Sequence, residues 1–438
     1  MSVQARVLIV ARDDSVAGPL AEGLDRLGWR TITARGPYAA LTVVADLQIE
    51  AVIIDLATVD EPAALAKRLK DSIAPRLLPV VAVGEPDGQL KTAFDLTLTN
   101  PLHPAQAVMR LENLFRMAVA EEEFELRLET FAERGRRLDL PDTQSGPYRV
   151  LAIGEPAPQF LALSNSLARH GVDVVGAFTA YTAFDYLHER AFDAVVLWGG
   201  ENQSEALSIA AGMRRNSKLY HIPTLLYLAA DSYVGVTEAF HRGVTDVASP
   251  ETPETETAAR VIELARCHRR QTLIRQALEK ARSSGLMDVT TGLFTRDLFA
   301  AHLVRLAAAS RQRNRPLSVC VLRVADKPHI HEARKGGWLD RAAPQIGSMI
   351  GRLVRVEDTA ARLGPEVFAL AFPATPGHAA RAAAERIAAV IACTAFDAGP
   401  GRPPFVVEFD IGVAAVEAGE TPAQALERAS AKSLLKAG

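Results

Sequence analysis

The chain has 438 residues, 48% of them hydrophobic, and a formal net charge of −3. At roughly 150 residues per domain, this length predicts about three domains. The near-neutral charge excludes a strong overall attraction to nucleic acid or to an anionic membrane. Three scattered cysteines are typical of a reducing compartment. No apolar run approaches the ~18 residues of a membrane span, and the N-terminus lacks a signal-peptide pattern. We therefore expect a cytoplasmic protein without membrane insertion.

The first part of the chain alternates strand and helix patterns. Three apolar runs are typical of buried strands, and they lie at 7–10, 51–55 and 78–84. A segment with helical periodicity follows the first run. Such alternation predicts a parallel sheet with helices on both faces. Residues 105–137 then predict one long helix, and we place the first domain, with this extended last helix, at 1–137.

The same alternation begins again after a linker rich in Pro, Gly and polar residues at 138–148. Further buried-strand runs indicate an internal repeat and a second α/β domain at 138–253; they lie at 149–154, 192–198 and 222–228. Residues 254–283 predict a second long helix, because acidic residues open it and basic residues close it. We take 254–285 as a linker helix and 286–438 as the third domain.

The two repeated domains resemble response-regulator receiver domains over their full length, which implies a doubly wound, flavodoxin-like fold for each. In that family an acidic pair after the first strand holds Mg²⁺, and an Asp ending the third strand accepts phosphate. A Thr or Ser follows the fourth strand and a Lys the fifth. Carboxylate oxygens suit Mg²⁺, and the metal and the Lys neutralise the incoming phosphoryl group.

Only the phosphoacceptor is in register in the first copy, as Asp55. Ala11 and Arg12 stand where the acidic pair belongs, and Asp13 and Asp14 are displaced from that position. Gly84 replaces the Thr or Ser, and Asn100 replaces the Lys. Two interpretations stay open for Asp55: a weakly phosphorylatable switch, or an Asp at the sheet edge without phosphate chemistry. In the second copy Trp198 stands at the phosphoacceptor position and cannot accept a phosphoryl group. We expect that copy to serve docking or dimerisation.

The third domain resembles the GGDEF domain of diguanylate cyclases. DVTTGLFTR (288–296) is similar to the family's DxLTGLxNR, GPEVF (364–368) aligns with GGDEF itself, and FDIGVA (409–414) aligns with a strand usually written SIGVA. The resemblance covers nearly the whole domain and implies an α+β, nucleotidyl-cyclase-like fold. Two receiver-like domains followed by a GGDEF domain is the order of the PleD-type diguanylate cyclases.

Several groups that cyclisation needs are replaced. Arg323 replaces the family's first metal-binding Asp, and His331 replaces an Asn that contacts guanine. Within the GGDEF motif, Pro365 replaces the second Gly and Val367 replaces the Glu that follows the metal-type acid. Lys436 is the Lys nearest to the position that holds phosphate in the family. Phosphoryl transfer between two GTP molecules requires bridging Mg²⁺, which Arg323 opposes. Pro365 removes an N–H and the permissive dihedrals of a tight turn. Asp340 and Glu366 match family acids, but we predict no cyclase activity and no bound metal, with Glu366 a polar turn residue.

An Arg and an Asp precede the predicted hairpin of GPEVF. In this family an RxxD motif five residues before GGDEF is the inhibitory site that binds cyclic di-GMP, and Arg355 and Asp358 match it at that spacing. An Arg fork can bind O6 and N7 of guanine or stack on its face, and a carboxylate can accept from the opposite edge. Arg386 matches a third position of this site. Arg311 and Arg313 are candidates for a secondary contact from a neighbouring domain.

The alternative for Arg355 and Asp358 is a surface ion pair spaced i,i+3, which contributes about 0.2–0.5 kcal/mol. We favour the ligand site and expect Arg355 to be exposed. The resemblance to catalytically degenerate members of this architecture implies a cyclic di-GMP effector that forms a homodimer. We expect it to recruit protein partners of a proteolysis or signalling pathway, and to be recruited itself to a cell pole. The basic stretch 266–282 predicts a solvated or dimer-facing helix, not a nucleic-acid site.

Two other functions stay open at this point. One is a phosphorylation-driven response regulator that switches through Asp55. The other is a half-site partner of an active diguanylate cyclase, to which this chain would supply part of a composite site.

Overall fold

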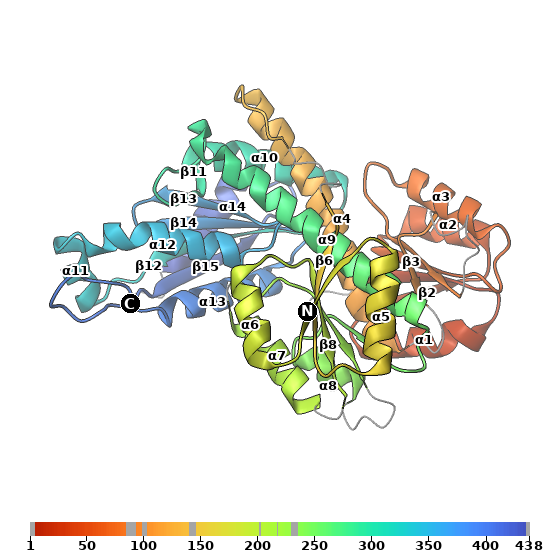
Figure 1. Cartoon of the computed structure of the whole chain (residues 1–438). Coiled ribbons are helices and arrows are strands. Elements are labelled where there is room, and N and C mark those ends of the chain that lie inside the picture. Colours follow the sequence, from red (N-terminus) through yellow and green to blue (C-terminus); the bar gives the residue numbers. More distant parts are fainter. Residues whose placement is uncertain are drawn as a thin grey trace.

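The computed structural model describes residues 5–84, 93–98, 103–139, 146–200, 203–216, 218–228 and 235–434. Within these ranges the chain forms three five-stranded sheets joined by two long helices (Figure 1). No helix of the described ranges combines the length and the apolar character that a membrane crossing requires. Two residues that the sequence singles out, Asn100 and Lys436, lie outside the described residues.

The first sheet has the strand order β2-β1-β3-β4-β5, and all its pairs are parallel. Its elements are β1 (Arg6–Val10), α1 (Asp14–Arg26), β2 (Arg30–Ala34), α2 (Pro37–Asp46), β3 (Ala51–Asp55), α3 (Pro62–Ser72), β4 (Val80–Val83) and β5 (Leu96–Leu98). Apolar clusters on both faces bury the short Val- and Ile-rich strands. The order is that of flavodoxin-like folds, in agreement with the doubly wound prediction.

The second sheet repeats this order as β7-β6-β8-β9-β10, again with parallel pairs. Its elements are β6 (Arg149–Ile153), α5 (Pro158–Arg169), β7 (Asp173–Ala177), α6 (Ala180–Glu189), β8 (Ala194–Trp198), α7 (Gln203–Arg215), β9 (Thr224–Tyr227), α8 (Val236–His241) and β10 (Asp246–Ala248). Trp198 ends β8 and stacks on Tyr227 with ring centroids 4.1 Å apart. A Cβ at Gly154 would lie 2.5 Å from that of Trp198, so aromatic packing fills the place of the phosphoacceptor.

The third sheet is mixed, with the order β11-β13-β14-β12-β15 and only the β11–β13 pair parallel. Its elements are β11 (Phe294–Thr295), α10 (Arg296–Gln312), β12 (Leu317–Val324), α11 (Pro328–Lys335), α12 (Trp338–Leu353), β13 (Thr359–Gly364), β14 (Val367–Pro373), α13 (Gly377–Ala392), β15 (Phe409–Ala415) and α14 (Pro422–Leu434). The α+β prediction is confirmed. Thr295, which departs from the family's Asn, caps α10 because its hydroxyl accepts the Leu298 N–H at 3.4 Å.

The long helices α4 (Pro104–Glu133) and α9 (Glu254–Lys280) connect the three domains. The start of α4 packs on the first sheet through Leu111, while its later Phe124 lies in the core of the third domain. The start of α9 packs on the second sheet, and its Ile274 also reaches the core of the third domain. Figure 1 shows the two helices crossing at the centre of the molecule, so the third domain is fixed relative to both α/β domains.

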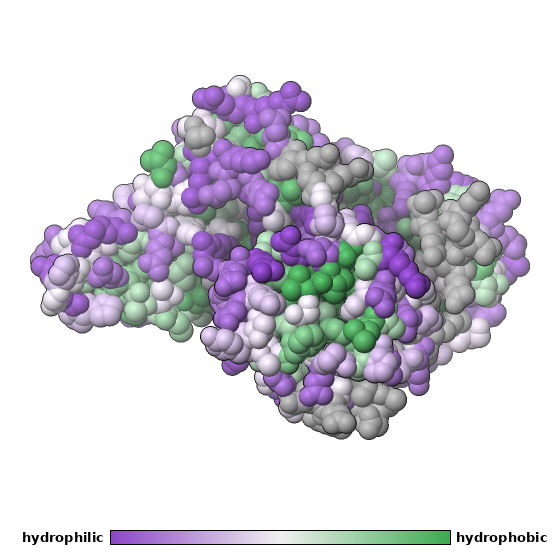
Figure 2. All heavy atoms as spheres, in the orientation of Figure 1, coloured by the Kyte–Doolittle hydropathy of each residue, from purple (hydrophilic) through white to green (hydrophobic). Residues whose placement is uncertain are grey.

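An apolar surface lies on the second domain. Figure 2 shows apolar side chains gathered between α5 and α6, on a face that is otherwise mostly polar. Exposed apolar residues of these elements and of the β7–α6 connection include Leu161, Phe178 and Tyr181. They accompany β7, which is the edge strand of the second sheet.

Candidate functional site

Arg355 and Asp358 lie in the turn between α12 and β13. The Asp358 N–H donates to the Arg355 carbonyl at 3.2 Å, and the Asp358 carboxylate accepts the Arg355 backbone N–H at 2.9 Å. Asp358 is only 6% exposed, and Arg355 is half-buried. The prediction that Arg355 is exposed is therefore wrong, and so is the alternative of a surface ion pair. The reason is that α4 and α9 cover this side of the third domain, which no local pattern reveals.

A buried network on α4 holds this turn. Arg127 donates from Nη2 to the Asp358 carbonyl at 3.0 Å and to the Thr359 hydroxyl at 3.3 Å. Its Nε donates to Glu123 at 2.6 Å. The same Glu123 oxygen accepts the Thr359 hydroxyl at 3.0 Å and lies 2.9 Å from His302 Nε2. The helix that leaves the first domain thus fixes the backbone of the RxxD turn.

The two charged groups of the turn are incompletely paired. Among the described residues, no acceptor binds the Arg355 guanidinium, and the buried Oδ1 of Asp358 has no donor. Burial, and then the nearby Glu357, raise the pKa of Asp358 to about 7. Burial, and then Arg116, lower the pKa of Arg355. Arg116 itself binds Glu357 at 3.1 Å. An available donor fork and an available acceptor therefore lie at one turn.

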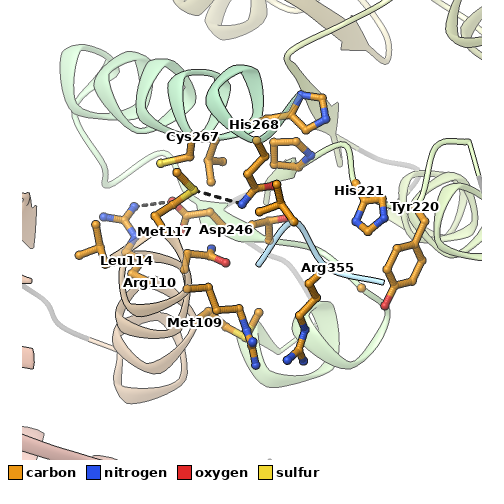
Figure 3. A pocket seen from close by; sticks show the side chains of 18 of the residues that line it. Met109, Arg110, Leu114, Met117, Tyr220, His221, Asp246, Cys267, His268 and Arg355 are labelled. Atoms are coloured by element: carbon orange, nitrogen blue, oxygen red, sulfur yellow. Dashed lines mark hydrogen bonds and ion pairs between the residues drawn. The ribbon is translucent and has the colours of Figure 1, made fainter. Parts of the chain in front are cut away.

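A cavity of about 510 Å³ adjoins this turn, between α4, α9 and the second and third domains (Figure 3). This volume lies in the ~300–1,000 Å³ range of small-molecule pockets. Its described lining includes seven arginines and three carboxylates, namely Arg110, Arg116, Arg214, Arg260, Arg275, Arg355, Arg386, Asp246, Glu263 and Glu357. The structure thus brings Arg355 and Arg386 together at a cavity whose excess of cations suits an anionic ligand.

The second domain supplies part of this cavity through the turn after α7. Arg386 donates to the Tyr220 hydroxyl at 3.0 Å, and its guanidinium carbon lies 5.6 Å from the Tyr220 ring centroid. The neighbouring His221 Nε2 lies 2.8 Å from the Arg352 carbonyl and 3.1 Å from Arg275. Burial, and then Arg275, lower the pKa of His221 to about 3, so the ring is neutral at pH 7. Sequence analysis missed these residues, because no local pattern marks them.

The basic stretch of α9 serves contacts within the chain. Arg269 donates to Asp193 of the second domain at 3.0 Å, and Arg270 binds Glu121 of α4 at 2.6 Å. Arg275 of the same stretch lines the cavity. The prediction of a solvated or dimer-facing helix is therefore wrong for these arginines.

Arg311 and Arg313 lie away from the RxxD turn within one chain. Arg311 is exposed at the end of α10, and Arg313 Nε lies 3.6 Å from Glu122 of α4. Neither lines the cavity beside Arg355. Their role as a secondary contact stays a prediction that concerns a neighbouring chain.

Ion pairs occupy the region of the GPEVF motif. Glu366 accepts from Arg334 with both carboxylate oxygens, at 2.7 and 2.6 Å. Arg334 also binds Asp326 at 2.6 Å, and Asp326 lies 2.7 Å from the exposed His331. Glu366 does lie in the two-residue turn between β13 and β14, but its description as a turn residue was incomplete, because it is the partner of an arginine.

These residues do not fit the divalent cation that the GGDEF resemblance implies. Both Glu366 oxygens are bound to a guanidinium, and Arg323 stands on β12 opposite Val367, with its Nη2 3.3 Å from Ser430 Oγ. Asp340 is exposed in the first turn of α12. A divalent cation needs free carboxylate oxygens, and two guanidinium groups oppose it.

Asp55 lies at the end of β3 and is 3% exposed. Its oxygens accept the Ala57 N–H at 3.1 Å and the Thr58 hydroxyl at 2.9 Å. The displaced acids of the first copy have structural partners: Asp13 caps α1 by accepting the Ser15 N–H at 3.0 Å, and Asp14 binds Arg35 at 2.6 Å. Each of these three acids thus has a partner within the first domain.

Comparison with known proteins identifies the third domain. Residues 285–436 match the family described as diguanylate cyclase, GGDEF domain, so the chain carries a GGDEF domain there. No curated protein matches the chain.

Similar solved structures include GGDEF proteins and a response regulator. The FimX GGDEF domain from Pseudomonas aeruginosa is 20% identical over 35% of this chain and 93% of its own, with a TM-score of 0.32. The GGDEF domain of DgcB from Caulobacter crescentus, in complex with c-di-GMP, is 22% identical over 35% of this chain and 87% of its own, with a TM-score of 0.32. A "probable two-component system response regulator/GGDEF domain protein" is 15% identical over 62% of this chain and 99% of its own, with a TM-score of 0.25.

Proposed function

We propose that the protein is a cyclic di-GMP effector whose GGDEF domain binds the nucleotide at Arg355, Asp358 and Arg386 and does not synthesise it. One observation carries the proposal: Arg355, whose guanidinium has no acceptor among the described residues, lines a cavity with more arginines than carboxylates, and the buried Oδ1 of Asp358 in the same turn has no donor there. Unpaired buried polar groups are costly, and a ligand with complementary groups removes that cost.

Cyclic di-GMP carries the complementary groups. The O6 and N7 acceptors of guanine match the Arg355 fork, and its N1–H and amine match the Asp358 carboxylate. The phosphates then pair with further arginines, and Arg386 is the one that matches a position of this site in the family pattern. Binding at this turn involves the second domain as well, because Arg386 contacts Tyr220.

The proposal of catalytic inactivity rests on the GPEVF region. Phosphoryl transfer needs Mg²⁺ to neutralise the charge that develops on the phosphates. The pairing of Glu366 with Arg334 and the cation at Arg323 leave that region without the ligands such an ion requires.

We further propose that nucleotide binding recruits a protein partner. Two degenerate receiver-like domains, a degenerate GGDEF domain and an intact RxxD pair resemble PopA, a cyclic di-GMP effector linked to cell-cycle-regulated proteolysis. The apolar surface of Leu161, Phe178 and Tyr181 along edge strand β7 supports a docking role for the second domain, between copies or with a partner. For the response to depend on ligand, the two states must differ in nucleotide affinity.

A direct test combines filter binding of radiolabelled cyclic di-GMP with a GTP turnover assay in Mg²⁺. We expect binding without product. Product from the protein alone would contradict the proposal, and extra product on mixing with an active cyclase would support the half-site alternative instead. If a phosphoryl donor labels the wild type and Asp55→Asn abolishes this labelling, the response-regulator alternative would be favoured.

A further inference from the structure

The cavity has an inner end away from the RxxD turn. Figure 3 shows Arg355 and Tyr220 on one side of the cavity and Leu114, Met117 and Cys267 on the other. We call this end the inner chamber; it is formed by α4, β10 and α9 and comprises Met109, Arg110, Leu114, Met117, Asp246, Arg260, Leu264 and Cys267. It lies between the two α/β domains, and the proposed nucleotide contacts do not use it.

Two arginines of the inner chamber have buried donors without acceptors among the described residues. Arg110 is 7% exposed and binds Asp246 through Nη2, but its Nη1 has no partner among the described residues. Arg260 binds the Val247 carbonyl at 3.2 Å through Nη1 and Glu256 through Nη2, but its buried Nε has no partner there. A buried N–H of a charged group favours an acceptor strongly, so the chamber offers two unused donors.

The carboxylate of the chamber, Asp246, and the neighbouring Glu263 of the cavity lining are already bound. Asp246 accepts from Arg110, and Glu263 accepts from Arg266 at 2.9 and 2.7 Å. Burial, and then Glu263, raise the pKa of the Cys267 thiol to about 12, so the thiol is neutral at pH 7. Available donors therefore exceed available acceptors, which favours a ligand that carries an acceptor group.

Much of the remaining lining of the chamber is apolar, and the polar Gln271 beside it donates to Met117 Sδ at 3.2 Å. Leu114 and Leu264 supply branched aliphatic surface, and Met109 and Met117 supply flexible thioethers. Methionine side chains adapt to aromatic and irregular ligands and make favourable sulfur–aromatic contacts. Apolar walls with a few convergent donors are typical of small-molecule sites.

We propose that the inner chamber binds a small molecule with an aromatic or otherwise apolar body and one acceptor group, such as a carboxylate, a sulfonate or a ring carbonyl. Arg110 Nη1 and Arg260 Nε bind the acceptor, and the leucines and methionines contact the body. This site lies in the same cavity as Arg355 but uses other residues, and it does not depend on the proposed nucleotide function. Two ligands have such a body and acceptor group: the guanine base of a nucleotide bound at the RxxD turn, or a second, independent molecule. The experiment below distinguishes these two ligands.

The probe is 1-anilinonaphthalene-8-sulfonate, an aromatic sulfonate whose fluorescence rises in apolar sites. We expect saturable binding at one site in the full-length wild type. Met117→Trp fills the chamber and should abolish this binding, and Arg260→Met removes one donor and should weaken it about tenfold. The matched control is Arg242→Met, because Arg242 forms the same i,i+4 pair with Glu238 on an exposed surface. Circular dichroism and thermal midpoints verify that the variants fold.

The outcomes decide both the site and its ligand. Non-saturable binding, or equal binding by wild type, Met117→Trp and Arg260→Met, overturns the proposal. Loss in the two chamber variants but not in Arg242→Met or Arg355→Ala supports it. If cyclic di-GMP then displaces the probe from the wild type, the base of the nucleotide occupies the chamber. If it does not, the chamber serves a second molecule, and failure of the nucleotide proposal leaves this result unaffected.

Discussion

Arg127 donates a hydrogen bond from Nη2 to the carbonyl oxygen of Asp358 at 3.0 Å, across 231 positions of the sequence. One residue belongs to the long helix that starts on the first sheet, and the other closes the RxxD turn of the GGDEF domain. Because both are buried, the docked α4 helps to hold the geometry of the turn. The candidate nucleotide site is thus a property of the assembled chain.

Arg127→Met should destabilise the protein and weaken cyclic di-GMP binding together. The substitution leaves the Glu123 carboxylate buried without its main partner, which costs about 3–5 kcal/mol in comparable buried pairs. Urea unfolding followed by circular dichroism measures the stability, and calorimetric titration measures the binding.

The control for that variant is Arg305→Met, on α10. Arg305 also joins α10 to α4, through Glu129 and Glu133, but these carboxylates are exposed. Such pairs contribute about 0–1 kcal/mol, so we expect a small loss of stability and unchanged binding. Equal losses in the two variants would show that the Arg127 network has no special role at the site.

Tyr220→Phe should tighten cyclic di-GMP binding by a few-fold. The Tyr220 hydroxyl accepts from Arg386 at 3.0 Å, so this bond competes with the nucleotide for the same guanidinium. A hydrogen bond to a charged group contributes about 1.5–3 kcal/mol, but this one is exposed to solvent, so we expect a gain of only a few-fold. Titration of wild type and Tyr220→Phe measures it, with the exposed Tyr38→Phe as control. Weaker binding by Tyr220→Phe would show that the hydroxyl contacts the ligand.

The fold was largely predictable, because local patterns determine its elements. Short runs such as 51–55 are continuous and apolar, and the order of strands and helices then implies parallel sheets. The GPEVF hairpin and both long helices also follow from local sequence. In the site, the RxxD spacing indicated Arg355 and Asp358, and the family pattern indicated Arg386; the structure places Arg355 and Arg386 beside one cavity.

What could not be predicted depends on contacts between domains. The burial of Arg355 and Asp358 arises from α4 and α9, which lie far away in the sequence. Tyr220 reaches Arg386 across 166 positions, and no periodicity encodes such a contact. The pairing of Glu366 with Arg334 was missed for a related reason: a charged residue on α11 has many possible partners until the tertiary packing is known.

The stability of the fold should fall as the pH rises through about 7, owing to Asp358. Its pKa is raised from 3.8 to about 7, so the folded chain binds this proton more tightly than the unfolded chain does. The contribution is fully present below the unfolded pKa and is lost as the pH passes the folded pKa. Asp358→Asn cannot titrate, so the difference in unfolding free energy between variant and wild type should change between about pH 4 and about pH 8. A constant difference would contradict the assignment.

Glu366→Gln should leave cyclic di-GMP binding unchanged, because Glu366 binds Arg334 and lies outside the lining of the cavity. The pair is partly exposed, so the loss of stability should not exceed about 1 kcal/mol. Titration and urea unfolding of the variant check both expectations. Loss of nucleotide binding would place the ligand at the GPEVF motif instead of the RxxD turn.

The most direct test of the central claim is calorimetric titration of cyclic di-GMP into wild type, Arg355→Ala and Arg352→Ala, with GTP as the second titrant. Arg352 is exposed three residues before Arg355 and serves as the matched control. We expect binding of cyclic di-GMP by the wild type and by Arg352→Ala, no binding by Arg355→Ala, and no response to GTP. Absence of binding in the wild type, or equal binding by Arg355→Ala, would contradict it.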